Sequence, residues 1–165
     1  GVAIVGAHQV VPDLLAPQGL IAGRKPTKAQ AGNLERAMEA CRAIGKLDIG
    51  QAAIAEHGRV VALEGLEGTD GMIRRVSELR EAGRLPADGK DGVLVKTKKP
   101  GQEVRADLPS IGPSTIEACA QAGLKGIAVE AGASLILSRG ETIAAARAAK
   151  LFIIGVAPQT HEAGS

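Results

Sequence analysis

Aromatic residues are almost absent from this sequence, which holds one Phe, no Trp and no Tyr among 165 residues. A core without further rings must be built from Ala, Val, Ile and Leu, and hydrophobic residues still make up 45% of the chain. Without aromatic platforms, base stacking cannot drive nucleic-acid binding, and a net charge of +2 is too small for a protein that follows a phosphate backbone. We therefore expect no nucleic-acid partner.

Cysteine is equally scarce, and long apolar runs are missing. Cys41 and Cys119 stand singly inside expected helices, with no C-x-x-C pair and no His/Cys cluster, so neither a zinc site nor a disulfide framework is indicated. We expect two buried, reduced thiols. No apolar run reaches the roughly 18 residues of a transmembrane helix, and no signal peptide is visible.

Short apolar runs do alternate with helical patterns along the chain. Expected strands cover residues 2–5, 52–56, 60–64, 92–96, 126–130, 135–137 and 151–154, and expected helices cover 27–45, 69–82, 113–122 and 138–150. Capping-box patterns open the first and last of these helices, at Thr27 with Gln30 and at Ser138 with Glu141. Residues 6–26 are rich in Gly and Pro and are typical of a loop with one helical turn. The alternation predicts a single α/β domain, a layered sandwich, and the hairpin at 52–64 predicts a mixed β-sheet flanked by helices.

The segment 64–71 lies between an expected strand and an expected helix. Its glycines allow a close backbone approach to a ligand, and a helix N-terminus presents free N–H groups that suit a phosphate. Glu67 and Asp70 are candidates to hold a divalent cation that bridges to phosphate oxygens. The alternative is that Thr69 or Asp70 simply caps the helix.

The segment 95–112 begins at the end of a strand and gathers the cations Lys96, Lys98, Lys99 and Arg105 around acidic residues that include Asp107. Ligands of α/β proteins usually bind at strand ends, and basic groups there suit an anionic ligand. The alternative is a charged loop in solvent.

Glu130 ends another apolar strand and is followed by Ala131 and Gly132, which is a frequent position for an active-site acid. The alternative is a strand end that meets solvent. The three histidines are scattered, and no Walker loop, G-x-G-x-x-G or G-x-S-x-G motif is present.

Taken together, these segments resemble one known family. The residues that carry the resemblance are Glu67-Gly68-Thr69-Asp70 with Arg74-Arg75, Gly92-Val93-Leu94-Val95-Lys96, Lys99-Pro100-x-Gln102-Glu103-x-Arg105-x-Asp107-Leu108-Pro109-x-Ile111-Gly112, Ala122-Gly123-Leu124-x-Gly126-Ile127 and Val129-Glu130-Ala131-Gly132. This order is similar to the C-terminal domain of the LpxI family of UDP-2,3-diacylglucosamine pyrophosphatases, and the match covers nearly the whole chain.

The resemblance implies a reaction in lipid A biosynthesis. Water attacks the α-phosphorus of UDP-2,3-diacylglucosamine and releases UMP and 2,3-diacylglucosamine 1-phosphate (lipid X), with Mg²⁺ or Mn²⁺ as the required cofactor. The family carries a further N-terminal domain, and the substrate lies between the two domains. We therefore expect residues 1–157 to form the C-terminal catalytic domain, 158–165 to form a tail, and the N-terminal domain to be absent from this chain, which starts at Gly1 directly on an apolar run. A lipid substrate also implies a cytoplasmic protein that is peripheral to the inner membrane and contacts its surface.

The resemblance also assigns roles to residues. Asp107 matches the family's essential aspartate, as a metal ligand or as the group that orients and deprotonates the water. The other expected metal-site carboxylates are Glu67, Asp70 and Glu130. The expected substrate-binding residues are Gly68, Thr69, Lys96, Lys99, Gln102 and Arg105; Lys96, Lys99 and Arg105 would bind the diphosphate and Gln102 a phosphate oxygen or the sugar.

Three alternatives stay open at this point. The same loops suit a related phosphatase or phosphotransferase that acts on another nucleotide or sugar phosphate. They equally suit a non-catalytic binding module for a nucleotide-lipid or a phosphate. A fragment that forms a homodimer through surface normally covered by the other domain is the third.

Overall fold

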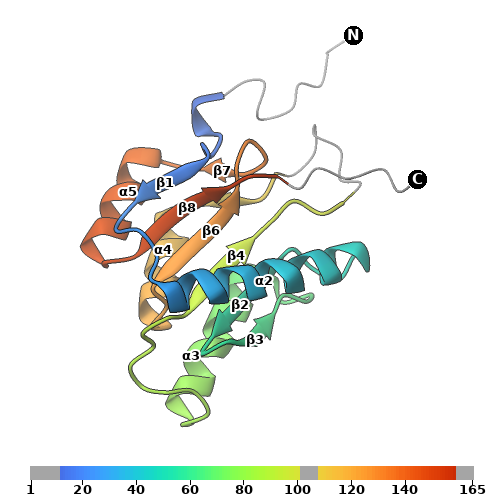
Figure 1. The fold of residues 1–165 in the computed structure, drawn as a ribbon, viewed down its shortest axis with the longest axis vertical. Coiled ribbons are helices and arrows are strands. Elements are labelled where there is room, and N and C mark those ends of the chain that lie inside the picture. The colour runs from blue at the N-terminus through green and yellow to red at the C-terminus, as the bar shows by residue number, and fades with distance from the viewer. Residues whose placement is uncertain (1–11, 101–107, 159–165) are drawn as a thin grey trace.

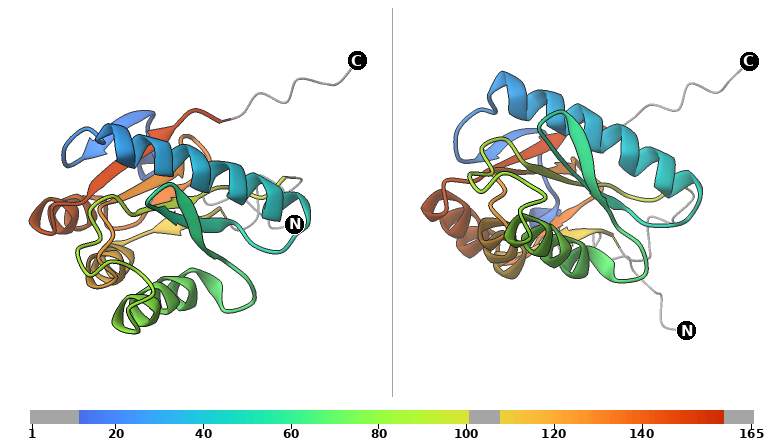
Figure 2. Two further views of the ribbon diagram at one scale, coloured as in Figure 1. Left: turned by 60° about the horizontal axis from the view of Figure 1, so that its bottom comes forward. Right: turned by 90° about the horizontal axis from the view of Figure 1, so that it is seen from below.

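A computed structural model describes residues 12–100 and 108–158 of the chain. Its centre is a six-stranded mixed β-sheet with helices on both faces, as Figures 1 and 2 show. Helix α2 (Lys28–Lys46) lies across one face. Helices α3 (Gly68–Glu81), α4 (Pro113–Gln121) and α5 (Arg139–Ala148) cover the other face. The predicted α/β class with a mixed, layered sheet is confirmed.

The strands of the main sheet follow the order β1-β8-β6-β4-β2-β3. Their bounds are Gly19–Ala22 (β1), Ala52–Glu56 (β2), Arg59–Leu63 (β3), Val93–Lys96 (β4), Gly126–Glu130 (β6) and Phe152–Val156 (β8). The central strands β4, β6 and β8 are parallel, and β1, β2 and β3 are each antiparallel to a neighbour. A short 3-10 helix, η1, covers Pro12–Leu14, and a separate parallel pair joins β5 (Ser110–Ile111) to β7 (Leu135–Ile136). The carboxyl ends of β4, β6 and β8 therefore meet at one edge of the sheet (Figure 1).

Side chains alternate between the two faces of each central strand, as the pleat of a β-strand requires. In β4, Leu94 packs among α3, α4 and α5, whereas Val93 and Val95 pack under α2. Under α2, Ala37 of the helix packs with the alanines of β2, and Phe152 of β8 belongs to the same cluster. Burial on both faces explains why these strands are continuous apolar runs in the sequence.

Local sequence signals account for several element boundaries. The Thr27 hydroxyl accepts a hydrogen bond from the Gln30 N–H and the Gln30 side chain accepts one from the Thr27 N–H, so the predicted capping box opens α2. The predicted hairpin turns at His57-Gly58. The predicted stop of α4 is also confirmed, because Gly123 takes a left-handed φ of +76° directly after the helix.

Two predictions are wrong. The stretch 6–26 is not only loop, since Gly19–Ala22 forms the edge strand β1, antiparallel to β8. A four-residue edge strand between Pro17 and Gly23 is too short to show a period in the sequence. Ser138 does not form a capping box, because its φ of +45° is left-handed and its side chain makes no cap hydrogen bond.

The predicted strand at 2–5 lies outside the described residues. Cys41 and Cys119 are both buried and unpaired to another cysteine, as predicted. No helix in the described ranges combines the length and hydrophobicity needed to cross a membrane.

Candidate functional site

The carboxyl edge of the parallel strands carries a cavity of about 520 Å³. We call it the main cavity. It lies where the first turns of α3, α4 and α5 approach the end of β4. Its lining residues are Glu67, Gly68, Thr69, Asp70, Lys96, Ser110, Gly112, Pro113, Ser114, Thr115, Leu137 and Ser138. Five predicted site residues, those at 67–70 and at 96, thus line the main cavity together.

Three helix N-termini open onto this cavity. The N-cap residues are Glu67 for α3, Gly112 for α4 and Ser138 for α5, and in these described helices none of the three caps its helix with a side-chain hydrogen bond. The first N–H groups of a helix have no partner inside the helix, and the helix dipole adds partial positive charge there. Uncapped N-termini that converge on one cavity are therefore suited to bind an anion.

Lys96 is the lysine that lines the main cavity. It is half-buried at the end of β4, and its Nζ donates a hydrogen bond to the carbonyl oxygen of Ser110 at 3.2 Å. Burial lowers the pKa of Lys96 below its ordinary 10.5, although the negative charges of Glu64 and Asp70 partly oppose the change. A lysine held at a partly desolvated position interacts strongly with an anion that enters the cavity.

Glu64 is a buried carboxylate behind the cavity wall. Its Oε2 accepts a hydrogen bond from the Thr69 hydroxyl at 2.5 Å, and its Oε1 accepts one from the Gln51 N–H at 3.4 Å. Thr69 therefore bonds to Glu64 instead of capping α3. Glu64 begins the candidate segment 64–71 but was not itself among the predicted site residues. Its position at the end of an apolar strand is the signal that could have identified it.

Glu67 is already engaged by neighbouring groups. Arg75 donates to its Oε1 at 2.6 Å, and the Gly65 N–H donates to its Oε2 at 3.1 Å. Its own backbone N–H and then the Arg75 charge hold the pKa of Glu67 below its ordinary value. Asp70 is exposed at the cavity, so of these two carboxylates Asp70 is the better placed to receive a cation.

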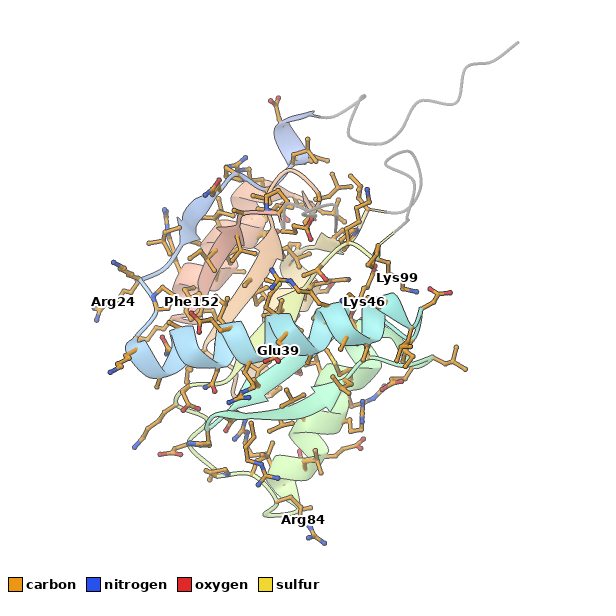
Figure 3. All side chains as sticks on the ribbon, turned by 45° about the vertical axis from the view of Figure 1, so that its right-hand side comes forward. Arg24, Glu39, Lys46, Arg84, Lys99 and Phe152 are labelled. Atoms are coloured by element: carbon orange, nitrogen blue, oxygen red, sulfur yellow. The ribbon has the colours of Figure 1, made fainter. Side chains whose placement is uncertain are left out.

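Lys99 and Glu130 line a different, smaller cavity of about 260 Å³ on the α2 face of the sheet. Thr97 and Cys41 line it as well. The alternation along the chain explains the separation, since Lys96 faces the main cavity and the next residue faces α2. Lys99 Nζ pairs with Asp48 Oδ1 at 3.1 Å, and Figure 3 shows Lys99 near Lys46 at the end of α2. Burial, the largest effect, and the charge of Glu64 raise the pKa of the Cys41 thiol to about 12, which excludes it as a thiolate nucleophile near neutral pH.

The remaining predicted residues, Gln102, Arg105 and Asp107, lie outside the described residues. The described chain stops at Pro100, which lines the smaller cavity, and resumes at Leu108, shortly before Ser110 of the main cavity. The two described ends of this segment thus adjoin the two cavities.

One group of potential metal ligands within the described ranges lies at the opposite edge of the sheet, away from the main cavity. It consists of Glu56, His57 and Asp91, whose ligand atoms lie within 4.8 Å of one another. Both oxygens of Glu56 are already held by Arg80, at 3.0 and 2.7 Å. Arg80 and Glu56 thus form an ion pair beside the hairpin turn, where the His57 N–H also donates to Asp91 Oδ1 at 3.1 Å.

Comparison with known proteins gives two matches. Residues 17–154 match the family model described as the LpxI C-terminal domain. Over 159 residues the chain is 46% identical to the UDP-2,3-diacylglucosamine pyrophosphatase LpxI of Caulobacter vibrioides, an alignment that covers 96% of this chain and 57% of that relative. The chain thus spans little more than half the length of the relative. The match covers the strand ends and helix N-termini that build the main cavity, and the chain belongs to the LpxI family, of which it contains the C-terminal domain.

Proposed function

We propose that this domain binds the diphosphate of UDP-2,3-diacylglucosamine in the main cavity and takes part in its hydrolysis to UMP and lipid X. The name of the relative supports the reaction. The observation that carries the proposal is the convergence of three uncapped helix N-termini and Lys96 on one cavity. A diphosphate needs several N–H donors and a cation, and this cavity offers both.

The same arrangement suits the transition state. Attack on phosphorus places negative charge on the non-bridging oxygens, and donors that are already fixed toward those oxygens stabilise it without reorganisation. The Ser110 carbonyl holds Lys96 in place at 3.2 Å. Glu64 fixes Thr69 at the start of α3 through the 2.5 Å hydrogen bond, so we assign Glu64 a positioning role.

One described carboxylate, Asp70, supports a Mg²⁺ or Mn²⁺ site of the kind that one or two carboxylates form with substrate phosphates. Asp70 is exposed at the cavity and would hold the ion together with the diphosphate. Such an ion supplies Lewis-acid stabilisation of phosphoryl charge. Glu67 serves better to fix the loop, because Arg75 already neutralises it. Asp107 keeps its two predicted roles, metal ligand or base for the water.

The acyl chains of the substrate need an apolar path away from the cavity. Leu137 lines the main cavity and is 40% exposed, and Leu66, directly before Glu67, is fully exposed. We propose that the acyl chains leave across these two leucines, toward the family's N-terminal domain and the membrane surface. Lys99 and Glu130 would then act from the smaller cavity on another part of the nucleotide or on the second domain.

The test is hydrolysis of UDP-2,3-diacylglucosamine by the full-length protein, with and without Mg²⁺, beside the variants Lys96→Met and Asp107→Asn. Release of UMP and lipid X that requires the metal and falls in both variants supports the proposal. Lys90→Met is the matched control, because Lys90 is an exposed lysine paired with Asp88 away from both cavities. Substrate binding without turnover in the folded wild type would replace the proposal with a binding module.

A further inference from the structure

A second concentration of basic residues lies at the opposite edge of the sheet, where β6 and β8 begin. It surrounds a cavity of about 520 Å³ that we call the basic cavity. Its lining residues are Gly23, Arg24, Lys25, Thr27, Gln30, Lys125, Arg147, Lys150 and Phe152. Five of these nine are Lys or Arg, and all nine lie in the described part of the chain.

The fold brings these cations together from separate loops. Gly23 has φ +77°, and a Cβ at this position would overlap the Leu151 carbonyl, so only glycine lets the loop after β1 lie against the start of β8. This close approach sets Arg24 beside the turn that precedes β8 (Figure 3). On the other side, the Phe152 N–H donates to the carbonyl of Lys125 at 3.1 Å.

The charge of the basic cavity is not balanced locally. None of its lining residues is acidic, and within the described ranges none of its five cations forms an ion pair. Other cations of the chain do pair, as Arg75 does with Glu67 and Lys90 with Asp88. These five residues are a quarter of the 20 Lys and Arg residues of the chain. The remaining Lys and Arg residues are fewer than the 18 Asp and Glu residues, so the excess positive charge of the protein is concentrated at the basic cavity.

Helix stability does not explain this distribution. Acidic residues stabilise a helix N-terminus, yet the first turn of α2 contains no acid and begins with Lys28 directly after the loop that carries Lys25. Arg147 does suit its helix, because it lies in the last turn of α5. The Thr27 capping box already satisfies part of the first turn of α2, so it is the charge of Lys25 and Lys28, added to the positive end of the helix dipole, that favours an anion in the basic cavity.

We propose that the basic cavity is a binding site for a compact soluble anion that carries two or more phosphate groups. The cavity has the volume of a small-molecule site, and its cations come from several directions, as a polyphosphate requires. It lies at the opposite edge of the sheet from the main cavity and is a separate site. A soluble anion is favoured over a membrane surface, because a bilayer bound at the basic cavity would leave the main cavity facing away from the lipid. This reason rests on the function proposed above.

The test uses inorganic triphosphate without metal, titrated into ¹⁵N-labelled protein and followed by amide chemical shifts. We expect shifts at Gly23, Arg24, Lys125 and Lys150 that saturate together. Removing one charge, in Lys125→Gln or Arg147→Gln, should weaken this binding by about tenfold, on the order of one charge-assisted hydrogen bond. Arg84→Gln is the matched control, because Arg84 is an exposed arginine near the hairpin that does not line the basic cavity.

The expected result is loss of affinity in the two basic-cavity variants with unchanged circular dichroism, and wild-type affinity in Arg84→Gln. Saturable shifts that persist in Lys96→Met would further separate this site from the main cavity. Shifts confined to Gly68, Thr69 and Ser114 would overturn the proposal, and so would equal weakening by the Arg84 control. A second arm uses vesicles that contain phosphatidylglycerol; binding to vesicles without binding to free triphosphate would assign the surface to a membrane and would also overturn it.

Discussion

Replacing Lys96 by methionine should make the protein more stable and less active at the same time. The lowered pKa of Lys96 means that burial outweighs the attraction of Glu64 and Asp70 for its charge, so folding disfavours the protonated form. Methionine replaces the aliphatic part of the lysine side chain and omits the charged terminal nitrogen, so it also loses the hydrogen bond to Ser110. We expect a net gain of about 1 kcal/mol in the free energy of unfolding near pH 7, within the range of substitutions that relieve functional sites.

The pH dependence of unfolding independently tests whether Lys96→Met stabilises the protein. The folded pKa of Lys96 lies below the unfolded value near 10.5, so the unfolded chain binds more protons between the two values. The free energy of unfolding of the wild type should therefore rise with pH across that window, and the advantage of the variant should shrink there. Urea unfolding measured between pH 7 and 10.5 tests this. Far-ultraviolet circular dichroism is the suitable signal, since the chain has no Trp and no Tyr.

Activity should move in the opposite direction. Losing one preorganised donor to the phosphoryl oxygens should lower kcat/KM by about 100- to 1,000-fold, whereas Lys90→Met should keep the wild-type value. A Lys96→Met variant that unfolds more easily than the wild type, or that hydrolyses the substrate at the wild-type rate, would refute the reasoning.

Three further outcomes are expected. Glu56→Gln should lower the free energy of unfolding in urea by about 3–5 kcal/mol, because it leaves the Arg80 guanidinium without its buried partner; a loss below about 1 kcal/mol would mean that solvent reaches the pair. Gly126→Ala should cost about 1–3 kcal/mol in the same assay, since its Cβ would overlap the Phe152 ring, and an unchanged midpoint would show that the ring can move. Cys41, with a pKa of about 12, should resist iodoacetamide at pH 7.5 in the native protein and react after unfolding, as mass spectrometry of the alkylated chain can show.

Much of the fold was predictable because its signals are local. The Thr27 capping box, the hairpin at His57 and the stop at Gly123 each depend on a few adjacent residues. The strand β1 was not predictable, because four residues show no period and their pairing with β8 depends on a distant part of the chain. The left-handed φ of Ser138 is likewise set by the surrounding fold, because Ser-x-x-Glu alone favours a capping box.

The candidate site likewise has one part that was predictable from the sequence and one part that was not. The loop at 67–70 and Lys96 were predicted together because strand ends and helix starts of an α/β sheet meet at one edge. The separation of Lys99 and Glu130 from them depends on which face of the sheet each side chain takes, and the expected strands did not fix that face. The roles of the residues in both cavities, and of Asp107 beyond the described ranges, stay predictions.

The lone ring of Phe152 packs over Gly126 and forms part of the wall of the basic cavity. Since the chain contains no other aromatic side chain except its three histidines, large ring-current displacements in the proton spectrum of the core have one phenyl source. The protons of Gly126 should resonate far from their usual positions. Any ligand that tilts this ring should shift these proton resonances measurably. The Gly126 signals can therefore report ligand binding at that edge of the sheet without an added label.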